Sequence, residues 1–250
     1  SNVSFDIKRG ERICIIGPNG TGKTTLLKMI MSEISPTSGH IKVGHNIVFG
    51  YYDQQQSMLN ETSTVLEEMR DAYSLYSDTQ LRGLLGRFLF KNDDVFKQIS
   101  ALSGGERARL ALLKLMLSGA NVLILDEPTS QLDPIAASDF LATLGKINRE
   151  LGTTILLTEH RLEEVFPLAI RVVVMDKGKI LCESTPAAVG EILREQGHGM
   201  FQAMPVPMRV WAGVKNSLPC PVTVRDGREW LSQMEVKGAL PEEPPEPVPE

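Results

Sequence analysis

A glycine-rich turn between a strand and a helix constrains this chain more than any other feature. Residues 17–25 read GPNGTGKTT; the apolar run before them has strand length, and residues 26–30 predict a helix with apolar positions on one side. Glycines in such a turn let backbone N–H groups curl around a phosphate, where the helix N-terminus adds partial positive charge. The predicted phosphate-binding residues are Gly17, Pro18, Asn19, Gly20, Thr21, Gly22, Lys23, Thr24 and Thr25.

Two side chains in this turn carry its charge chemistry. Lys23 supplies a full positive charge that can reach the β- and γ-phosphate oxygens of a nucleotide. The hydroxyl of Thr24 is placed to ligate a Mg²⁺ ion. A glycine-rich loop without function has little use for a lysine at this position, so the pattern favours a nucleotide site.

Matching acidic residues follow a second strand. Residues 122–125 read VLIL, a continuous apolar run typical of a central parallel strand, and Asp126 and Glu127 come directly after it. Open α/β sheets bind ligands at the carboxyl ends of their strands. We therefore expect Asp126 to hold Mg²⁺ and Glu127 to act as the catalytic residue that polarises the attacking water.

A histidine follows a third strand. His160 comes after the predicted strand of residues 153–157. A lone histidine is more often an ordinary surface or core residue than a functional one. Its position at a strand's carboxyl end, with two phosphate-binding motifs on neighbouring strands, favours a catalytic role as a sensor of the γ-phosphate.

A second glycine-containing helix start is the most diagnostic string. Residues 102–106 read LSGGE and open a helix with apolar positions. Ser103, Gly104 and Gly105 therefore offer a second helix N-terminus to an anion. Since the chain already has one phosphate-binding helix end, the second makes sense if it serves the nucleotide of another domain.

Together, these motifs resemble the ATP-binding cassette (ABC) domain over about residues 3–195. The resemblance implies an α/β fold: a P-loop NTPase (RecA-like) core with a mixed or parallel sheet, a small helical subdomain and a C-terminal appendage. It implies ATP hydrolysis with ATP and Mg²⁺, in a head-to-tail pair with a second ABC domain, as a homodimer or paired cassette. Ser103 and Gly105 would contact the γ-phosphate in trans, and residues 130–133 resemble the D-loop that crosses the interface.

The resemblance also assigns the residues after the segment GYYD. Gln54 resembles the Q-loop glutamine that touches Mg²⁺ and reports on the γ-phosphate, with Gln55 and Gln56 as the other choices. It further implies an adenine-stacking aromatic residue before the P-loop. Phe5, in a predicted strand of residues 3–7, is expected to be a core residue instead, which puts the affinity for nucleotide in doubt.

The chain divides into four predicted parts. Residues 1–56 and 119–196 form the nucleotide-binding core, and residues 57–118 the helical subdomain, in which Thr64-x-x-Glu67 is a capping box. Residues 197–235 predict a small packed appendage rather than an apolar binding surface, with a hairpin at residues 222–230 around an Asp-Gly turn. Residues 236–250 are rich in Pro and Glu and predict an extended linker or tail.

Composition limits the possible settings. The net charge of -5 argues against a domain that holds nucleic acid by bulk electrostatics, which weakens an RNA-facing role without excluding it. No apolar run approaches the roughly eighteen residues that span a bilayer, so no direct membrane span is expected. The scattered Cys14, Cys182 and Cys220 are typical of buried apolar residues in a reducing compartment. These features indicate a cytoplasmic location, which includes the inner face of the cell membrane.

The subfamily signals differ along the chain. Residues 1–129 resemble ABC-F proteins, soluble tandem ATPases that act on ribosomes, whereas residues 130–250 resemble the energy-coupling-factor and cobalt-type importer ATPases. The chain is either one importer ATPase with a divergent helical lobe or a hybrid of two cassettes joined near Thr129. The favoured function is the energy-coupling ATPase of an importer, with transmembrane transporter subunits as partners. The alternatives are a translation-associated ATPase with the ribosome as partner, a hybrid that binds ATP with impaired coupling, and a nucleotide-binding module without turnover.

Overall fold

A six-stranded sheet forms the centre of the computed structural model, which describes residues 3–53 and 59–234. The strand order is β2-β3-β4-β1-β5-β6, in which β6 is antiparallel to β5 and the other neighbours are parallel. The strands are β1 (Arg12–Ile16), β2 (Phe49–Asp53), β3 (Val122–Asp126), β4 (Thr154–Thr158), β5 (Arg171–Asp176) and β6 (Lys179–Ser184). This mixed, mostly parallel sheet confirms the predicted fold class.

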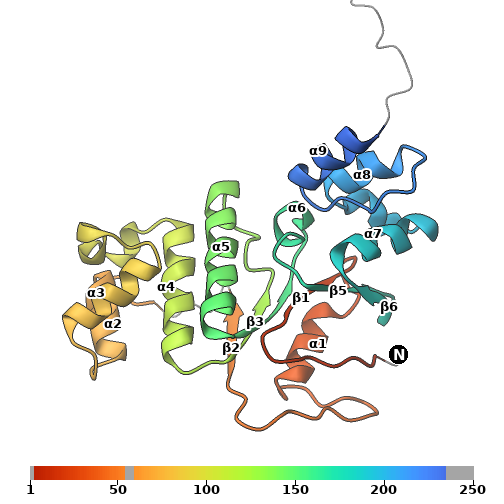
Figure 1. Ribbon diagram of the computed structural model, residues 1–250. Helices are drawn as coiled ribbons and strands as arrows, with labels where there is room; N and C mark the ends of the chain where they lie inside the picture. The colour runs from red at the N-terminus through yellow and green to blue at the C-terminus, as the bar shows by residue number, and fades with distance from the viewer. Residues whose placement is uncertain (1–2, 54–58, 235–250) are drawn as a thin grey trace, which may run out of the picture.

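Helices flank the sheet and extend from it on both sides (Figure 1). The first five α-helices are α1 (Lys23–Ile30), α2 (Val65–Ala72), α3 (Asp78–Arg87), α4 (Gly104–Leu117) and α5 (Pro134–Leu151). The C-terminal ones are α6 (Leu162–Val165), α7 (Pro186–Glu195), α8 (Val206–Ala212) and α9 (Val224–Gln233). Short 3-10 helices are η1 (Asn92–Phe96), η2 (Ile99–Ala101) and η3 (Gly199–Ala203).

Alternating side chains bury both faces of the sheet. In β1, Ile13 and Ile15 belong to the hydrophobic cluster that includes α1, whereas Cys14 and Ile16 belong to the cluster that includes α4 and α5. All four side chains are fully buried. A parallel sheet covered on both faces reads as a continuous apolar run in sequence, which is why these strands were recognisable.

Local capping sets where several helices begin. Thr64 and Glu67 form the predicted capping box of α2, and Ser103 and Glu106 form another at the start of α4. Asp133 caps α5 through the N–H groups of Ile135 and Ala136, and Gly152 ends that helix in the left-handed conformation.

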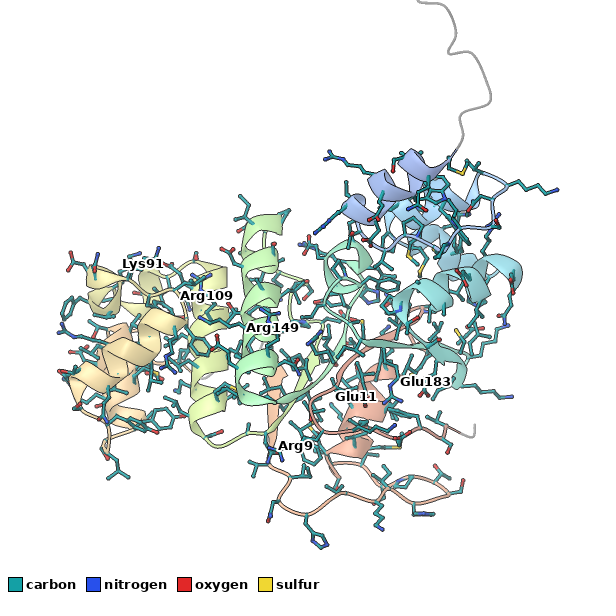
Figure 2. The ribbon with its side chains drawn as sticks, viewed as in Figure 1. Arg9, Glu11, Lys91, Arg109, Arg149 and Glu183 are labelled. Carbon is teal, nitrogen blue, oxygen red and sulfur yellow. The ribbon has the colours of Figure 1, made fainter. Side chains whose placement is uncertain are left out.

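An ion-pair cluster ties the start of β1 to the antiparallel edge of the sheet. The Arg171 guanidinium on β5 lies 2.8 Å from a carboxylate oxygen of Glu11 and 2.6 Å from one of Glu183. Figure 2 shows Glu11 and Glu183 close together beside the sheet. Because these side chains are mostly buried, the pairs hold β5 and β6 against the segment that leads into the P-loop.

The predicted strand at residues 3–7 is wrong. Val3, Phe5 and Ile7 keep the alternating burial of a strand and pack beside α1, but their backbone forms no ladder with the described strands. The Asp6 carbonyl accepts a hydrogen bond from the Arg171 side chain instead. Side-chain alternation thus marked a half-buried extended segment, and Phe5 is a packing residue as expected.

The predicted hairpin at residues 222–230 is also wrong, because this segment contains most of helix α9. Thr223 caps the helix, and the Asp226 carboxylate returns to the Thr223 N–H, so the Asp of the supposed turn completes a capping box. Gly227 lies inside the helix, where a Cβ would be 3.2 Å from Pro207 of α8. Its role is close helix packing rather than a turn.

The rest of the C-terminal appendage packs as expected. Met204, Met208, Trp211 and Trp230 are buried, each with no more than 5% of its surface exposed. The Trp211 ring N–H donates to the Leu218 carbonyl. Residues 235–250, including the predicted linker, lie outside the described residues. No described helix is both long and apolar enough to cross a membrane.

Phe140 tests how far α5 stabilises the sheet. Its ring is fully buried, with its centroid 5.4 Å from that of Tyr52 on β2. We expect Phe140→Ala to lower the free energy of unfolding by about 3–5 kcal/mol, measured by urea denaturation. Ile135→Ala is the matched control, because Ile135 lies on the same helix and is 77% exposed. Equal losses for both variants would contradict this packing.

Candidate active site

The glycine-rich turn lies between β1 and α1, as predicted. Gly17 packs tightly against β5, since a Cβ there would lie 2.2 Å from the Met175 carbonyl oxygen. Gly20 and Gly22 have φ of 76° and 95°, in the left-handed region that favours glycine. Gly22 is the cap residue of α1 and has no side chain to occupy the helix N-terminus. These backbone conformations are the ones in which glycine-rich turns before a helix bind anions through their N–H groups.

Lys23 lies across the base of this loop. Its side chain is 5% exposed, and its Nζ donates to the carbonyl oxygens of Gly17 at 2.9 Å and Pro18 at 3.3 Å. Burial lowers the pKa of Lys23, while the negative charges of Glu127 and Asp126 oppose that shift. The P-loop lysine thus lies in the field of both acids predicted to accompany it.

Threonines in the loop have distinct environments. Thr21 is buried, and its hydroxyl donates to the Pro18 carbonyl at 2.9 Å, which stabilises the turn. Thr24 and Thr25 are exposed at the first turn of α1, with Pro18, Asn19 and Gly20 exposed in the loop before it. The Thr24 hydroxyl is therefore accessible to a ligand.

The two acids lie at the carboxyl end of β3. The Asp126 carboxylate accepts a hydrogen bond of 2.6 Å from the Thr158 hydroxyl on β4. Glu127 has φ of 48°, a left-handed conformation that costs a non-glycine residue roughly 1–3 kcal/mol. Its N–H donates to both the carbonyl and the hydroxyl oxygen of Thr158, at 3.2 and 3.0 Å. This strained backbone turns the Glu127 side chain away from the strand.

His160 meets Glu127 directly. Its Nε2 lies 2.7 Å from Glu127 Oε1, and the two side chains are 44% and 38% exposed. The predicted base and the predicted phosphate sensor are therefore neighbours, and both are open to solvent. Because a carboxylate accepts hydrogen bonds and does not donate them, the imidazole Nε2 is the donor in this pair.

Glu159, which had no predicted role, supports the loop behind the acids. Its carboxylate is 2% exposed and accepts hydrogen bonds from the N–H groups of Thr129 at 2.8 Å and His160 at 3.2 Å. Burial raises the pKa of Glu159, and these hydrogen bonds partly oppose the rise. Nothing in the local sequence signals this role, because it depends on how β4 lies beside the turn after β3.

A pocket of about 210 Å³ opens beside the P-loop and His160. Two of its lining residues, Met200 and Ala203, come from η3 in the C-terminal appendage. The other lining residues are Gly17, Pro18, Asn19, Glu159, His160 and Leu162. The appendage thus borders the region that the sequence assigns to the nucleotide.

The LSGGE segment belongs to a different region of the chain. Ser103 and Gly104 are exposed at the N-terminus of α4, and Gly105 packs against α5, where a Cβ would lie 2.7 Å from Ala136 Cβ. Helix α4 contributes to one hydrophobic cluster of the sheet and α1 to the other. The structure therefore brings the P-loop, the acids and His160 together but leaves Ser103, Gly104 and Gly105 apart from them.

Gln54, with the alternatives Gln55 and Gln56, lies outside the described residues. Strand β2, which precedes it, ends at Asp53, the register partner of Asp126. The described residues contain no group of three or more His, Cys, Asp or Glu that could hold a metal ion by themselves. The accessible Thr24 hydroxyl and the Asp126 carboxylate suit Mg²⁺, which takes few protein oxygens and shares its other positions with phosphates and water.

Sequence comparisons match this architecture. A family model described as ABC transporter matches residues 1–130. The protein of Bacillus subtilis named "Putative ATP-binding protein YdiF" is 51% identical over 133 residues, covering 53% of this chain and 21% of that protein. ABC transporter F family member 5 of Arabidopsis thaliana is 42% identical over 161 residues, covering 64% of this chain and 23% of that protein. A putative ABC transporter ATP-binding protein of Bacillus cereus is 35% identical over 216 residues, covering 75% of this chain and 37% of that protein.

Solved structures give the same result for the fold. The cassette cbiO1 of Clostridium perfringens, described as part of the ABC transporter complex cbiONQ, superposes with a TM-score of 0.63 and 26% identity, covering 79% of this chain and 87% of that one. The dimeric cassette MJ0796 superposes with a TM-score of 0.60 and 24% identity, covering 74% of this chain and 89% of that one. The chain spans between a fifth and two fifths of the length of the three curated relatives.

The matches thus include both an ABC transporter F family protein and a cassette described as part of an ABC transporter complex. With a matching family model over half of its length, a cassette fold, and a P-loop that meets the acid pair and His160, this chain belongs to the ABC transporter family and is one of its ATPase domains.

Proposed function

We propose that this chain binds Mg·ATP and hydrolyses it to ADP and phosphate, with Glu127 as the base. The observation that carries the proposal is the contact of 2.7 Å between Glu127 and His160, in the electrostatic reach of the P-loop lysine. An exposed carboxylate at this edge of the sheet can accept a proton from water while the water oxygen attacks the γ-phosphorus. The bond from the γ-phosphorus to the bridging oxygen then breaks, and ADP leaves with that electron pair.

The remaining residues of the site have complementary roles. Residues 17–25 hold the phosphates through backbone N–H groups, and Lys23 exchanges its carbonyl partners for phosphate oxygens. Thr24, Asp126 and Gln54 would hold Mg²⁺, which neutralises the charge that develops on the phosphates. His160 hydrogen-bonds the γ-phosphate and keeps Glu127 oriented.

The proposal includes a second ABC domain. Ser103 and Gly104 are exposed at the start of a long helix, and Gly105 is buried directly after them. All three lie apart from the P-loop of their own chain. A helix N-terminus of this kind suits the γ-phosphate held by a partner. Two chains arranged head to tail would form two composite sites.

For the coupled partner we favour the transmembrane subunits of an importer. The likeness to cbiO1, which is described as part of a transporter complex, supports this choice. The ribosome is the second candidate, supported by the identity with ABC transporter F family proteins. The importer role places the chain in the cytoplasm at the inner face of the membrane.

Glu127→Gln tests the base. The amide keeps the size of the side chain but accepts no proton, so we expect the turnover rate to fall by about 10²–10⁴-fold while ATP still binds. Phosphate release and equilibrium binding of ATP are measured on the same preparations. Glu150→Gln is the control, since Glu150 is exposed near the far end of α5. An unmodified chain without turnover, or unchanged turnover in Glu127→Gln, would contradict the proposal.

Mixing two inactive variants tests the composite site. Lys23→Ala removes the P-loop cation, and Ser103→Arg blocks the start of α4 with a large cation. We expect each variant alone to be inactive and their mixture to recover part of the phosphate release, because a mixed pair contains one intact P-loop facing one intact α4 start. Each variant mixed with more of itself is the control. A mixture as inactive as its components means that the site is not shared between chains.

Fractionation of cells that produce the tagged chain tests the partner. We expect the chain to co-purify with integral membrane subunits after detergent extraction and to be absent from ribosome pellets in sucrose gradients. The Glu127→Gln variant is included because slower turnover prolongs ATP-bound complexes. Sedimentation with ribosomes, released by added ADP, would favour the second candidate.

A further inference from the structure

We propose that Thr158 is a positioning residue that sets the geometry of Asp126 and Glu127 for the metal and the attacking water. This inference rests on the proposed ATPase function and deepens it. Neither the P-loop pattern nor the acid pair requires a particular residue at this position, so the assignment comes from the geometry at the ends of β3 and β4.

The sheet register brings Thr158 to the acids. In the parallel pair β3·β4, Asp126 and Thr158 are direct partners at the last position of each strand. Thr158 is fully buried, so water has no access to replace its hydrogen bonds. Its side chain therefore serves the neighbouring strand rather than the solvent.

The Thr158 hydroxyl acts as a donor to one acidic residue and as an acceptor from the next. It donates to Asp126 Oδ1 at 2.6 Å and accepts from the Glu127 N–H at 3.0 Å. The first bond orients the carboxylate and occupies one oxygen, which leaves the other oxygen for a cation. The second bond acts on the residue proposed as the base.

The bond to Glu127 helps maintain a strained backbone. Glu127 has φ of 48°, and its N–H is shared between the Thr158 carbonyl, at 3.2 Å, and the Thr158 hydroxyl. Such strain persists where the surroundings supply several constraints. Because this conformation directs the Glu127 side chain to His160, loss of the hydroxyl would loosen the base as well as the metal ligand.

Binding of Mg·ATP to chains that also carry Glu127→Gln tests the proposal without turnover. In this background, we expect Thr158→Val to weaken the Mg²⁺-dependent binding of ATP by about tenfold to a hundredfold, measured by calorimetry. ATP binding in the presence of EDTA should stay unchanged. Thr158→Ser keeps the hydroxyl and should bind within about twofold of its parent, and Thr158→Ala, a second variant without the hydroxyl, should resemble Thr158→Val.

Thr154→Val is the matched control. Thr154 is a buried threonine at the other end of the same strand, and its hydroxyl oxygen accepts a hydrogen bond of 3.0 Å from the Gly10 N–H. It should lower stability toward urea without changing the dependence on Mg²⁺. In chains with Glu127 intact, Thr158→Val should lower kcat and raise the Mg²⁺ concentration for half-maximal rate, whereas Thr154→Val should do neither.

Three results would overturn the proposal: binding by Thr158→Val and Thr158→Ala equal to that of the parent, the same defect in Thr154→Val, or failure of Thr158→Ser to restore binding. Failure of the proposed function gives a different result. A parent chain that binds no Mg·ATP would overturn both assignments together, whereas a chain with Glu127 intact that binds Mg·ATP but releases no phosphate would overturn the ATPase alone and leave the comparison of the Thr158 variants to decide this proposal. Circular dichroism confirms that each variant compared is folded.

Discussion

The parallel pairing of β3, β4 and β1 is the constraint on which the candidate site depends. These three strands are neighbours in the sheet and end at the same edge, so the chain leaves all of them on one side. The acid pair follows β3, His160 follows β4, and the P-loop follows β1. The P-loop and the acid pair are separated by about a hundred residues in the sequence, and they meet because β4 alone lies between β1 and β3 in the sheet. Reversing the direction of β1 or β3 would place the P-loop and the acids at opposite edges of the sheet.

This convergence places charged groups where burial opposes ionisation. The Lys23 ammonium and the Glu159 carboxylate are almost inaccessible to solvent, and each is compensated by hydrogen bonds to or from the backbone. Glu127 adds a left-handed backbone at a residue with a long side chain. Proteins concentrate such local conflicts at functional sites and stabilise them by the surrounding fold. Here the stabilising fold is the sheet, with apolar side chains buried on both of its faces.

Features encoded by neighbouring residues were predictable from the sequence. The turn of residues 17–25 between strand and helix and the capping box at Thr64 each depend on a few adjacent positions, and the structure confirms them. The hairpin predicted at residues 222–230 was wrong, because the Asp-Gly pair that is typical of a turn also fits a helix whose glycine packs against another helix.

The strand predicted at residues 3–7 was wrong for a related reason. Alternating burial of Val3, Phe5 and Ile7 reports side-chain packing, whereas a strand also needs a backbone partner that sequence alone does not reveal. Thr158 and Glu159 were overlooked because their partners are on β3 and in the turn after it. The role of Thr158 follows from its register with Asp126, and that of Glu159 from the position of the turn after β3 beside the end of β4. Neither arrangement can be derived from adjacent residues in the sequence.

Contacts within one chain connect the acids to the segment offered to a partner. The Ser130 N–H donates to the Glu127 carbonyl, which folds residues 127–130 into a turn. Two residues later, Leu132 is buried against the start of α4, where a Cβ at Gly104 would lie 3.4 Å from its side chain. The loop that carries the proposed base therefore packs against the segment proposed to contact the other nucleotide.

The glycines of that segment are what permit this proximity. A Cβ at Gly105 would lie 2.7 Å from Ala136 Cβ, so any side chain there would push α4 away from α5. Both helices begin at this contact, since Ser103 caps one and Asp133 the other. In the proposed head-to-tail pair, a displacement of the loop after β3 would move the start of α4 with it, because close-packed protein interiors have low compressibility. The small residues at positions 104 and 105 thus keep the acid loop in contact with α4, and in the proposed pair they would also leave the N-terminus of that helix free of side chains that could block the partner's phosphate.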